Sequence, residues 1–506
     1  MAVQTRRLAA AAIVAALALA GCTAGSGTQP PATGGSGTSA APTAITIGLA
    51  LEPTSLDFTT NDGAAIPQVL LDNVYEGLVK LDANGAIVPD LATKWTLGDG
   101  NTTYTFDLVP NAAFTNGAKL TADDVKFSLD RVKTAWTTSL KAKMDVVKSV
   151  DVLSPTQVKV TLSQPSASWL YAMTTRVGAI FSKDGVAALA TAPVGTGPYQ
   201  LDTWKRGDSI VLKRNESYWG TKPYFSTVTL RYITDPTAMN NALISKTIDV
   251  IGTVQAPESL AQFTGGAYQV IEGATNGEVV LSFNNGKGLL TDKKLRMAIR
   301  EGIDHKALVD TCWAGHGQLI GSMVPPTDPW YEDLTGVTPY DQAKAKALVA
   351  EAGATGKTLR LRVPAIPYAT SCGTVVKSML EQLGLKVNLE TLEFPVWLEQ
   401  VFKQADYDMS IVAHVEPRDL AAVFANKDYY LRYNSPVVQA AVAAADAGTP
   451  EQQVAEMKKA ARQIADDAAA DFLFLLPNLM VAQPGITGLP KNAVGEAFDL
   501  GALARS

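Results

Sequence analysis

The sequence predicts an α/β protein that folds as two or three lobes, and three observations support this. The chain has 506 residues, which is too long for one simple hydrophobic core. It is 47% hydrophobic and 18% charged, as expected of a globular rather than a disordered protein. Between residues 359 and 413, expected strands alternate with expected helices in the order βαβαβ, which is typical of a parallel sheet with helices on its faces.

The N-terminal segment is typical of a secreted lipoprotein. Arg6 and Arg7 precede an apolar run, residues 8–20, that covers about 20 Å as a helix and is too short to cross a hydrocarbon core of about 30 Å. Such a segment predicts a secretory signal, here residues 1–21. It ends in the letters LAGC, which resemble the bacterial lipobox, so we expect Cys22 to carry the lipid anchor. A plain signal peptide that ends near a cysteine is the alternative.

Residues 22–43 consist of small, uncharged and weakly apolar types and predict a flexible tether. Together with the anchor, this places the protein on the extracytoplasmic face of the cell membrane. The most apolar later run, residues 472–476, is interrupted by Pro477 and predicts a buried strand. With Cys22 lipidated, Cys312 and Cys372 remain, and they form either one disulfide or two isolated buried thiols.

The folded part is expected to begin with a β-branched strand at residues 44–51. Thr121 can cap a helix, and Asp124 can complete a capping box with it. Other expected helices cover residues 67–79, 237–244, 295–303, 340–351, 374–383 and 396–404. Other expected strands cover residues 104–108, 157–162, 210–212, 228–233, 359–363, 387–392 and 408–413.

Motifs of enzymes and of nucleic-acid-binding proteins are missing or incomplete. Residues 353–358 imitate a phosphate-binding loop, but Glu351 stands where a glycine is needed, so they predict a helix end and a turn. Residues 195–199 imitate a dinucleotide fingerprint without its third glycine and predict a turn. The three histidines and the lack of HExxH, CxxC and G-x-S-x-G patterns argue against catalysis, a metal site or a cofactor. A formal net charge of −6 without a basic stripe argues against nucleic acid.

A cluster of polar residues follows the last strand of the βαβαβ unit. Ligands of parallel sheets lie beyond the carboxyl ends of the strands, so we examine the loops after residues 363, 392 and 413. The third loop contains His414, Glu416, Arg418 and Asp419, which present both signs of charge. They form either a ligand site, which we favour, or a self-neutralising network of salt bridges.

Several passages occur in an order and spacing typical of one protein family. They are residues 73–79 (NVYEGLV), 89–92 with Trp95, 104–108, Phe114 with Gly117, 121–125, 194–199, Asn215 with 218–220, and 292–304. Together they resemble the peptide/nickel/opine class of extracytoplasmic solute-binding proteins, solute-binding family 5. The resemblance covers roughly residues 45–305 by motif and the remainder by pattern.

The resemblance implies a two-lobed periplasmic-binding-protein-like clamp with an additional third domain. We expect lobe I to comprise residues 44–82, 195–288 and 481–506, domain II residues 83–194, and lobe III residues 289–480. It further implies a monomer that captures a small solute, such as an oligopeptide, an opine or a nickel chelate. The two lobes would close on it and deliver it to the permease and ATPases of an ABC importer. A surface hydrolase without a recognisable motif and a ligand sensor with the same fold are the alternatives.

The resemblance also implies ligand contacts. The loop at residues 52–57 lines the cleft in family members, and the residues that we expect to contact ligand there are Glu52, Ser55 and Asp57. Tyr368 lies in a second cleft loop. Ile366 stands where the dipeptide-binding branch has a carboxylate-clamping arginine, which puts a standard dipeptide in doubt.

Glu416 could instead receive an amine, and Arg418 an anionic end. Trp397 could stack on the ligand, although a core position is the commoner outcome for a tryptophan. We expect Arg418→Ala to abolish ligand-induced closure while folding stays nearly intact.

Overall fold

The computed structural model describes residues 43–61 and 63–506. The predicted signal at residues 1–21, the predicted lipidation site Cys22 and the predicted tether up to residue 42 lie outside the described residues. Thr43 is part of the folded structure, because its hydroxyl donates to the main-chain oxygen of Tyr224 at 2.6 Å.

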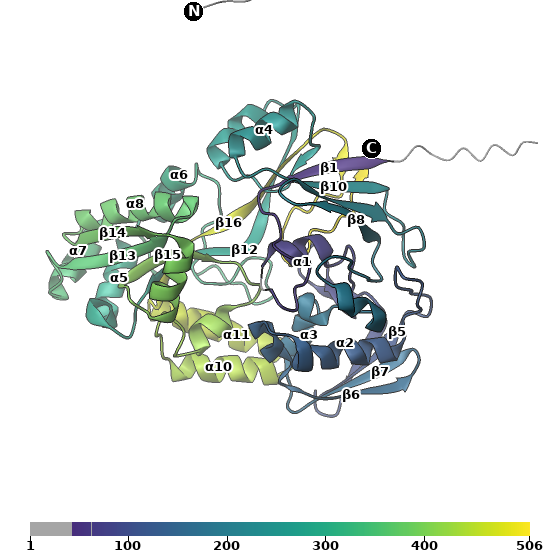
Figure 1. Cartoon of the computed structure of the whole chain (residues 1–506). Helices are drawn as coiled ribbons and strands as arrows, with labels where there is room; N and C mark the ends of the chain where they lie inside the picture. The colour runs from purple at the N-terminus through teal and green to yellow at the C-terminus, as the bar shows by residue number, and fades with distance from the viewer. Residues whose placement is uncertain (1–42, 62) are drawn as a thin grey trace, which may run out of the picture. The chain divides into compact units, whose positions relative to one another are not determined.

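A ten-stranded sheet forms the backbone of the fold (Figure 1). Its order is β14-β13-β15-β12-β16-β11-β1-β10-β9-β8. The strands are β1 (Ala44–Leu49), β8 (Tyr199–Lys205), β9 (Ser209–Arg214), β10 (Thr227–Tyr232), β11 (Val250–Ile251), β12 (Gln269–Phe283), β13 (Thr358–Pro364), β14 (Lys386–Leu392), β15 (Met409–His414) and β16 (Ala470–Ala482). The long antiparallel strands β12 and β16 belong to both halves of this sheet and connect lobe I with lobe III.

The lobe III half of the sheet confirms the predicted parallel βαβαβ unit, since β13 pairs in parallel with both β14 and β15. One face packs on α5 (Lys293–Glu301), α6 (His305–Cys312), α7 (Gln342–Glu351) and α8 (Pro367–Gln382). The other packs on α9 (Phe394–Trp397), α10 (Pro436–Ala447) and α11 (Pro450–Asp466). The sheet is therefore covered on both faces, as parallel sheets require.

A disulfide joins two helices of lobe III. Cys312 at the end of α6 and Cys372 in α8 are bonded, with Cα atoms 4.9 Å apart. Of the two arrangements that the sequence leaves open, the structure has the bonded one. The bond fixes α8 one turn after Tyr368.

Domain II contains a separate antiparallel sheet of order β4-β5-β7-β6. Its strands are β4 (Ala92–Gly98), β5 (Thr103–Leu108), β6 (Val147–Ser154) and β7 (Gln157–Leu162), and α2 (Ala122–Ala135) and α3 (Ala167–Ala172) accompany them. The capping box of Thr121 and Asp124 forms at the start of α2 as predicted. Domain II and lobe I share one hydrophobic core, so they are continuous inside the molecule.

Shorter elements complete lobe I and its junction with domain II. They are α1 (Ala65–Leu70), β2 (Val79–Leu81), β3 (Ile87–Pro89), α4 (Pro236–Ile244), β17 (Ile486–Thr487) and β18 (Ala504–Arg505). The turn predicted at residues 195–199 packs directly on residues 73–75. A Cβ at Gly195 would collide with the main-chain oxygen of Val74, so this turn needs glycine for close packing.

Several element boundaries differ from the sequence predictions, and three of them have a clear physical reason. The helix predicted at residues 67–79 ends at Leu70, and the chain turns through Asp72, whose φ is 61°. Helix α8 starts at Pro367, seven residues before the predicted start, because proline suits the first helical position. Strand β16 continues through Pro477, which lies at a register shift opposite Ala274, where the ladder is already irregular.

The two-lobed α/β architecture with an added domain is therefore confirmed. We propose that β12 changes from lobe I to lobe III at the register shift between Ala274 and Glu278, ten residues earlier than expected from sequence. None of the helices in the described part of the chain is long and apolar enough to cross a membrane.

Candidate ligand-binding site

The ends of the parallel strands in the two lobes face one another. Strand β1 runs in the same direction as β12, since it is parallel to β11, and both β11 and β12 are antiparallel to β16. Strand β15 is antiparallel to β12 and runs back toward lobe I. The carboxyl ends of β1 and β15 therefore point toward the segment that joins the lobes. These ends are where α/β sheets bind ligands.

The predicted polar residues follow the end of β15, and two of them, His414 and Asp419, contact each other. His414 is 8% exposed and lies opposite Glu278 in the antiparallel register. Its Nε2 is 3.1 Å from the hydroxyl of Tyr430, and its Nδ1 is 3.6 Å from a carboxylate oxygen of Asp419. Glu416, two residues after His414, is exposed to solvent.

Arg418 connects lobe III to domain II. Its guanidinium lies over the ring of Tyr171 in α3, at 3.8 Å from the centroid, and 4.8 Å from the ring centroid of Trp330. Its Nε is 3.4 Å from a carboxylate oxygen of Asp328, and both side chains of this ion pair are nearly buried, at 13% and 10% exposure. Arg418 thus has two aromatic partners and one acidic partner.

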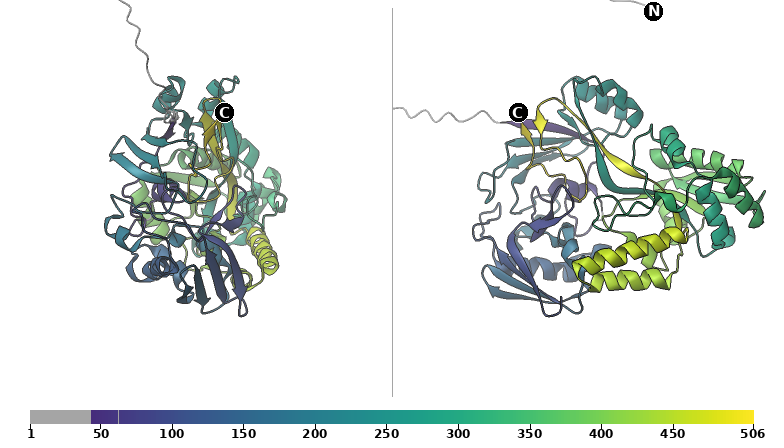
Figure 2. Two further views of the ribbon diagram at one scale, coloured as in Figure 1. Left: turned by 90° about the vertical axis from the view of Figure 1, so that its right-hand side faces the viewer. Right: turned by 180° about the vertical axis from the view of Figure 1, so that it is seen from behind.

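A second contact joins the same two parts. The carboxylate of Asp446 in α10 accepts hydrogen bonds from the hydroxyl of Ser166, at 3.0 Å, and from the main-chain N–H of Ser168, at 2.8 Å. It therefore binds the N-terminal end of α3 from lobe III. Figures 1 and 2 show α10 reaching the side of domain II in both the front and the rear view.

Two acids of the cluster are perturbed by their surroundings. Burial raises the pKa of Asp328 to about 6, although Arg418 opposes that shift. Burial also raises the pKa of Glu278 well above its ordinary value, and the nearby carboxylates of Asp419 and Asp328 add to the shift. Arg418 therefore does not offset burial and the repulsion among the acids, and both carboxyls hold a proton more readily than free acids do.

The predicted loop of lobe I is held by contacts within that lobe. Glu52 accepts hydrogen bonds from the indole of Trp204, at 2.7 Å, and from the main-chain N–H of Gly207, at 2.9 Å. Asp57 accepts from the hydroxyl of Thr59 and from its N–H, and Ser55 accepts from the N–H of Asp57. These bonds fix the conformation of the loop, and its hydrogen bonds do not bring it to the lobe III cluster.

Tyr368 and Trp397 take different positions. The hydroxyl of Tyr368 accepts a hydrogen bond from the N–H of Ala413 at 2.9 Å, so this side chain lies at the end of β15 beside the cluster. Trp397 is 3% exposed, donates to the hydroxyl of Ser410 at 3.0 Å, and packs in the core of lobe III. The structure gives Trp397 the core position, and we leave it out of the contacts proposed below.

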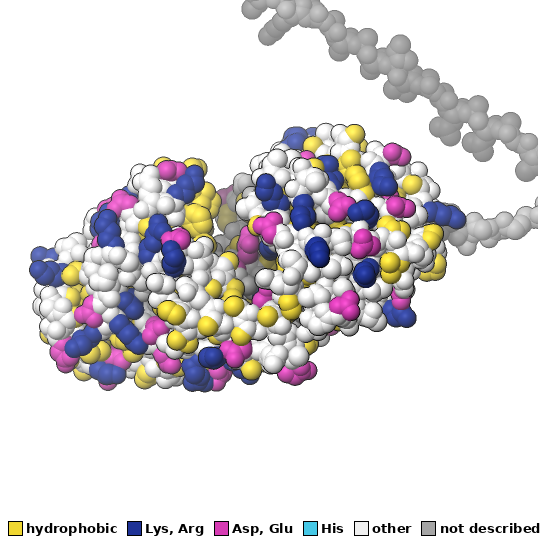
Figure 3. Space-filling model, turned by 90° about the horizontal axis from the view of Figure 1, so that it is seen from below, with side chains coloured by type: hydrophobic (Ala, Val, Ile, Leu, Met, Phe, Trp, Pro, Cys, Tyr) yellow, Lys and Arg dark blue, Asp and Glu magenta, His cyan; other side chains and the backbone are white. Residues whose placement is uncertain are grey.

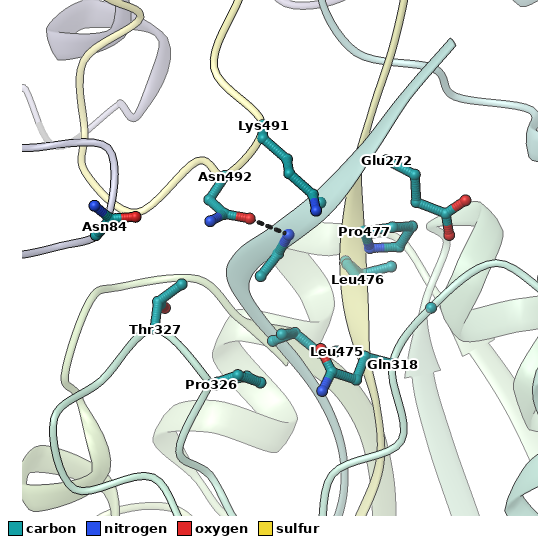
Figure 4. Close-up of a pocket in the computed structure, with 13 residues that line it drawn as sticks. Asn84, Glu272, Gln318, Pro326, Thr327, Leu475, Leu476, Pro477, Lys491 and Asn492 are labelled. Carbon is teal, nitrogen blue, oxygen red and sulfur yellow. Dashed lines mark hydrogen bonds between the residues drawn. The ribbon is translucent and has the colours of Figure 1, made fainter.

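A cavity of about 530 Å³ lies against the two strands that join the lobes (Figure 4). Its lining comes from all three parts of the fold, with Asn84 from the domain II range, Gln318 from lobe III and Lys491 and Asn492 from the C-terminal part of lobe I. None of the residues predicted from sequence lines it. Its size is typical of small-molecule sites.

The joining strands are tightly packed at this cavity. The side-chain oxygen of Asn492 accepts a hydrogen bond from the N–H of Ala274 at 2.9 Å, shown as a dashed line in Figure 4. A Cβ at Gly273 would collide with the main-chain oxygen of Lys491, so only glycine fits there. Seen from below, the surface is hollowed between two raised parts (Figure 3).

Sequence reasoning did not identify Glu278, Asp328, Tyr171 or Trp330 as part of this site. For Glu278 a signal exists, because it is an acid directly before the apolar run of residues 279–281 in a strand. The others lie in loops and a short helix that only the tertiary structure brings to Arg418. No group of three or more His, Cys, Asp or Glu side chains in the described part of the chain has the arrangement of a metal site.

Comparison with known proteins shows a consistent similarity. Residues 86–430 match the family model described as "Bacterial extracellular solute-binding proteins, family 5 Middle". The probable D,D-dipeptide-binding periplasmic protein of Escherichia coli is 27% identical over 499 residues, which are 91% of this chain and 94% of that protein. The nickel-binding periplasmic protein of the same organism is 30% identical over 348 residues, which are 62% and 65% of the two chains.

Solved structures have the same fold. The oligopeptide-binding protein AppA from Bacillus subtilis, in complex with a nonapeptide, superimposes with a TM-score of 0.75 at 21% identity. The superposition covers 92% of this chain and all of that one. The similarity extends through both lobes and the added domain.

Proposed function

The chain belongs to family 5 of the bacterial extracellular solute-binding proteins, and on this basis we propose that it captures a small solute between lobes I and III and delivers it to an ABC importer. The observation that carries the proposal is the pair of facing strand ends, joined by β12 and β16 and flanked by the polar cluster around His414. Lobes joined by two strands can close by a hinge motion when a ligand contacts both.

The proposed ligand is an oligopeptide or a peptide-like solute. Exposed apolar side chains lie at the strand ends of both lobes, with Leu51 after β1, Phe394 after β14 and Val415 after β15, and they can receive apolar parts of a ligand. The proposed polar contacts are the loop at residues 52–57, Tyr368 and the cluster from His414 to Asp419. Opines and nickel chelates are alternative ligands that the experiment below includes.

The relatives named above support this role, since their names describe binding proteins for a D,D-dipeptide, for nickel and for an oligopeptide. We propose that the chain has no catalytic activity of its own. We also propose that it acts as a monomer and meets the permease of an importer when it has closed around its ligand.

The proposed location is the outer face of the cell membrane, with the lipid on Cys22. Two or three acyl chains bind a protein stably to a bilayer, because each buried methylene contributes about 0.8 kcal/mol. A Cys22→Ser variant tests this: the wild-type chain should sediment with membranes and the variant should appear in the soluble fraction. A variant that stays with the membranes would refute lipidation at Cys22.

Native mass spectrometry of the purified full chain, followed by thermal shift, tests the binding function. The ligand library contains di- to hexapeptides, opines, oligosaccharides and nickel–histidine chelates. A ligand at 100 times its dissociation constant should stabilise the native state by about 2.7 kcal/mol, which gives a measurable shift. A bound mass or a shift supports solute capture and identifies the ligand class, whereas turnover of a library member would favour a surface hydrolase.

A further inference from the structure

Glu278 is a buried acid at the centre of the strand-end cluster. It lies in β12, directly opposite His414 of β15, in the first register pair after the irregularity that joins the lobes. Only 2% of the residue is exposed. The side chain is therefore buried at the end of lobe III from which β12 leads back to lobe I, and solvent does not surround it.

One carboxylate oxygen of Glu278, Oε2, has no hydrogen-bond partner among the described residues. The two ring nitrogens of His414, the histidine opposite it, already lie near Tyr430 and Asp419. Buried polar atoms in folded proteins are almost always paired, so an unpartnered carboxylate oxygen needs an explanation. An ammonium or a guanidinium group from a ligand would supply the missing donor.

The charges around Glu278 are mostly negative. Asp419 and Asp328 face it closely enough to raise its pKa, and Glu416 lies in the same loop. The nearby cation is Arg418, which is paired with Asp328. In the empty site these surroundings favour the protonated form of the Glu278 carboxyl, and a cationic group that binds there would displace this proton and pair with the carboxylate.

Aromatic rings add to this preference. Tyr171 and Trp330 already contact one guanidinium, that of Arg418, and Tyr429 packs near the ring of His414, with centroids 6.3 Å apart. Aromatic faces attract cations in desolvated surroundings. The cluster thus combines an unpaired buried acid with rings of the kind that bind cations.

We propose that Glu278 binds a cationic group of the captured solute, an ammonium or a guanidinium, and so makes this protein selective for ligands with a positive charge at that end. This inference rests on the proposed function, because it requires solute capture between the lobes. It assigns the ligand class by charge, which the similarity to known proteins does not.

The full-length chain, solubilised in detergent, is incubated with the di- to hexapeptide mixture and with the same mixture after acetylation of its amines. Two matched sets of acetylated peptides, which differ only in arginine or glutamine at one position, test separately whether a guanidinium group increases binding. Bound peptides are identified by native mass spectrometry. We expect wild-type protein to retain amine-bearing or arginine-bearing peptides at least tenfold more than their neutral counterparts.

Glu278→Gln keeps the shape of the side chain and removes its charge, and it should reduce retention of cationic peptides at least tenfold. Glu381→Gln in α8 also removes one acid from lobe III, at an exposed position paired with Lys377, and should change retention less than twofold. The unliganded Glu278→Gln protein should melt several degrees higher, because it no longer buries an acid beside two others. A misfolded variant would melt lower.

The possible outcomes test the role of Glu278 separately from the proposed solute capture. If peptides bind but neither acetylation, loss of arginine nor Glu278→Gln changes retention, Glu278 does not bind a cation, and solute capture still holds. If cationic peptides bind and the Gln variant loses them without a lower melting temperature, the inference is supported. If no member of the peptide, opine, oligosaccharide or chelate library binds to the wild-type protein, both are overturned.

Discussion

Replacement of Arg418 by alanine should destabilise the protein, and not merely weaken ligand-induced closure as the sequence alone predicts. The side chain is 13% exposed, contacts the rings of Tyr171 and Trp330, and pairs with the buried carboxylate of Asp328. Its removal therefore breaks contacts between lobe III and domain II that exist without a ligand. Folding and closure should both depend on it.

The expected cost follows from two contributions. Each cation–π contact contributes about 0.5–1 kcal/mol, so the two rings account for about 1–2 kcal/mol. Loss of the ion pair adds to this, because removal of one partner of a buried pair leaves an uncompensated charge. The cost of the lost ion pair is limited, because the pKa of Asp328 is already about 6 and rises further without Arg418. The carboxyl can then bind a proton near neutral pH and lose its charge. We expect a total of about 2–4 kcal/mol at pH 8.

The cost should also depend on pH. The folded-state pKa of Asp328, about 6, is above its ordinary value of 3.8, so the folded wild-type protein binds more protons than the unfolded chain between these values. Its stability therefore falls as pH rises through that window. Without Arg418 the folded-state pKa of Asp328 is higher. The free energy of unfolding of the variant therefore keeps falling at higher pH, by up to about 1.4 kcal/mol per pH unit. At pH 5 only the cost of about 1–2 kcal/mol from the rings should remain.

Urea denaturation of wild type and Arg418→Ala at pH 5 and pH 8 measures both effects. Arg418→Gly is the matched control, because the backbone here has a φ of 57°, which glycine adopts freely. Glycine removes the same side chain and should be about 1 kcal/mol less destabilising than alanine. A cost below about 0.5 kcal/mol, or an equal cost at the two pH values, would refute the roles assigned to the rings and to Asp328.

Three further predictions concern other parts of the fold. Burial raises the pKa of Glu76 from 4.5 to about 8, so the free energy of unfolding should fall by up to about 1.4 kcal/mol per pH unit as pH rises between these values. Glu76→Gln should reduce this dependence in urea titrations at several pH values. An unchanged pH dependence would exclude Glu76 as its source. Replacement of Cys312 and Cys372 by serine should lower the free energy of unfolding by about 2–4 kcal/mol, because the disulfide closes a loop with a sequence separation of 60. Equal urea midpoints of the oxidised wild type and the serine variant would contradict this. Gly273→Ala should lower the melting temperature by several degrees, because the new Cβ collides with the main chain of Lys491, and unchanged melting in calorimetry would show that the joining strands can relax.

Much of the fold could be predicted from local patterns. The βαβαβ unit of lobe III was predictable because strand and helix segments alternate there along the chain, which favours a parallel sheet. The helix that ends at Leu70 was not, because its end depends on packing against the glycine turn at residues 195–197. Pro477 did not end β16, since the ladder is already irregular at that point.

The candidate site was predictable only where it follows a strand. His414 and Asp419 were found because the carboxyl end of a parallel strand is a general position for ligands, and the strand itself had a clear pattern. Trp397 illustrates the limit of this approach, since a tryptophan after a strand can face either the cleft or the core, and here the hydroxyl of Ser410 satisfies it inside the core.

The most informative residue, Glu278, depends on pairing between distant parts of the chain. Its charge matters only because β12 leaves lobe I, passes the irregularity after Ala274 and lies antiparallel to β15 with His414 as its neighbour. Nothing local in the sequence specifies that register. From the sequence alone, an acidic residue before an apolar strand is expected to lie in solvent at the end of the strand. In the structure Glu278 is buried and its Oε2 has no hydrogen-bond partner among the described residues. The burial from which we infer a cationic ligand is therefore created by strand pairing rather than by the residue type.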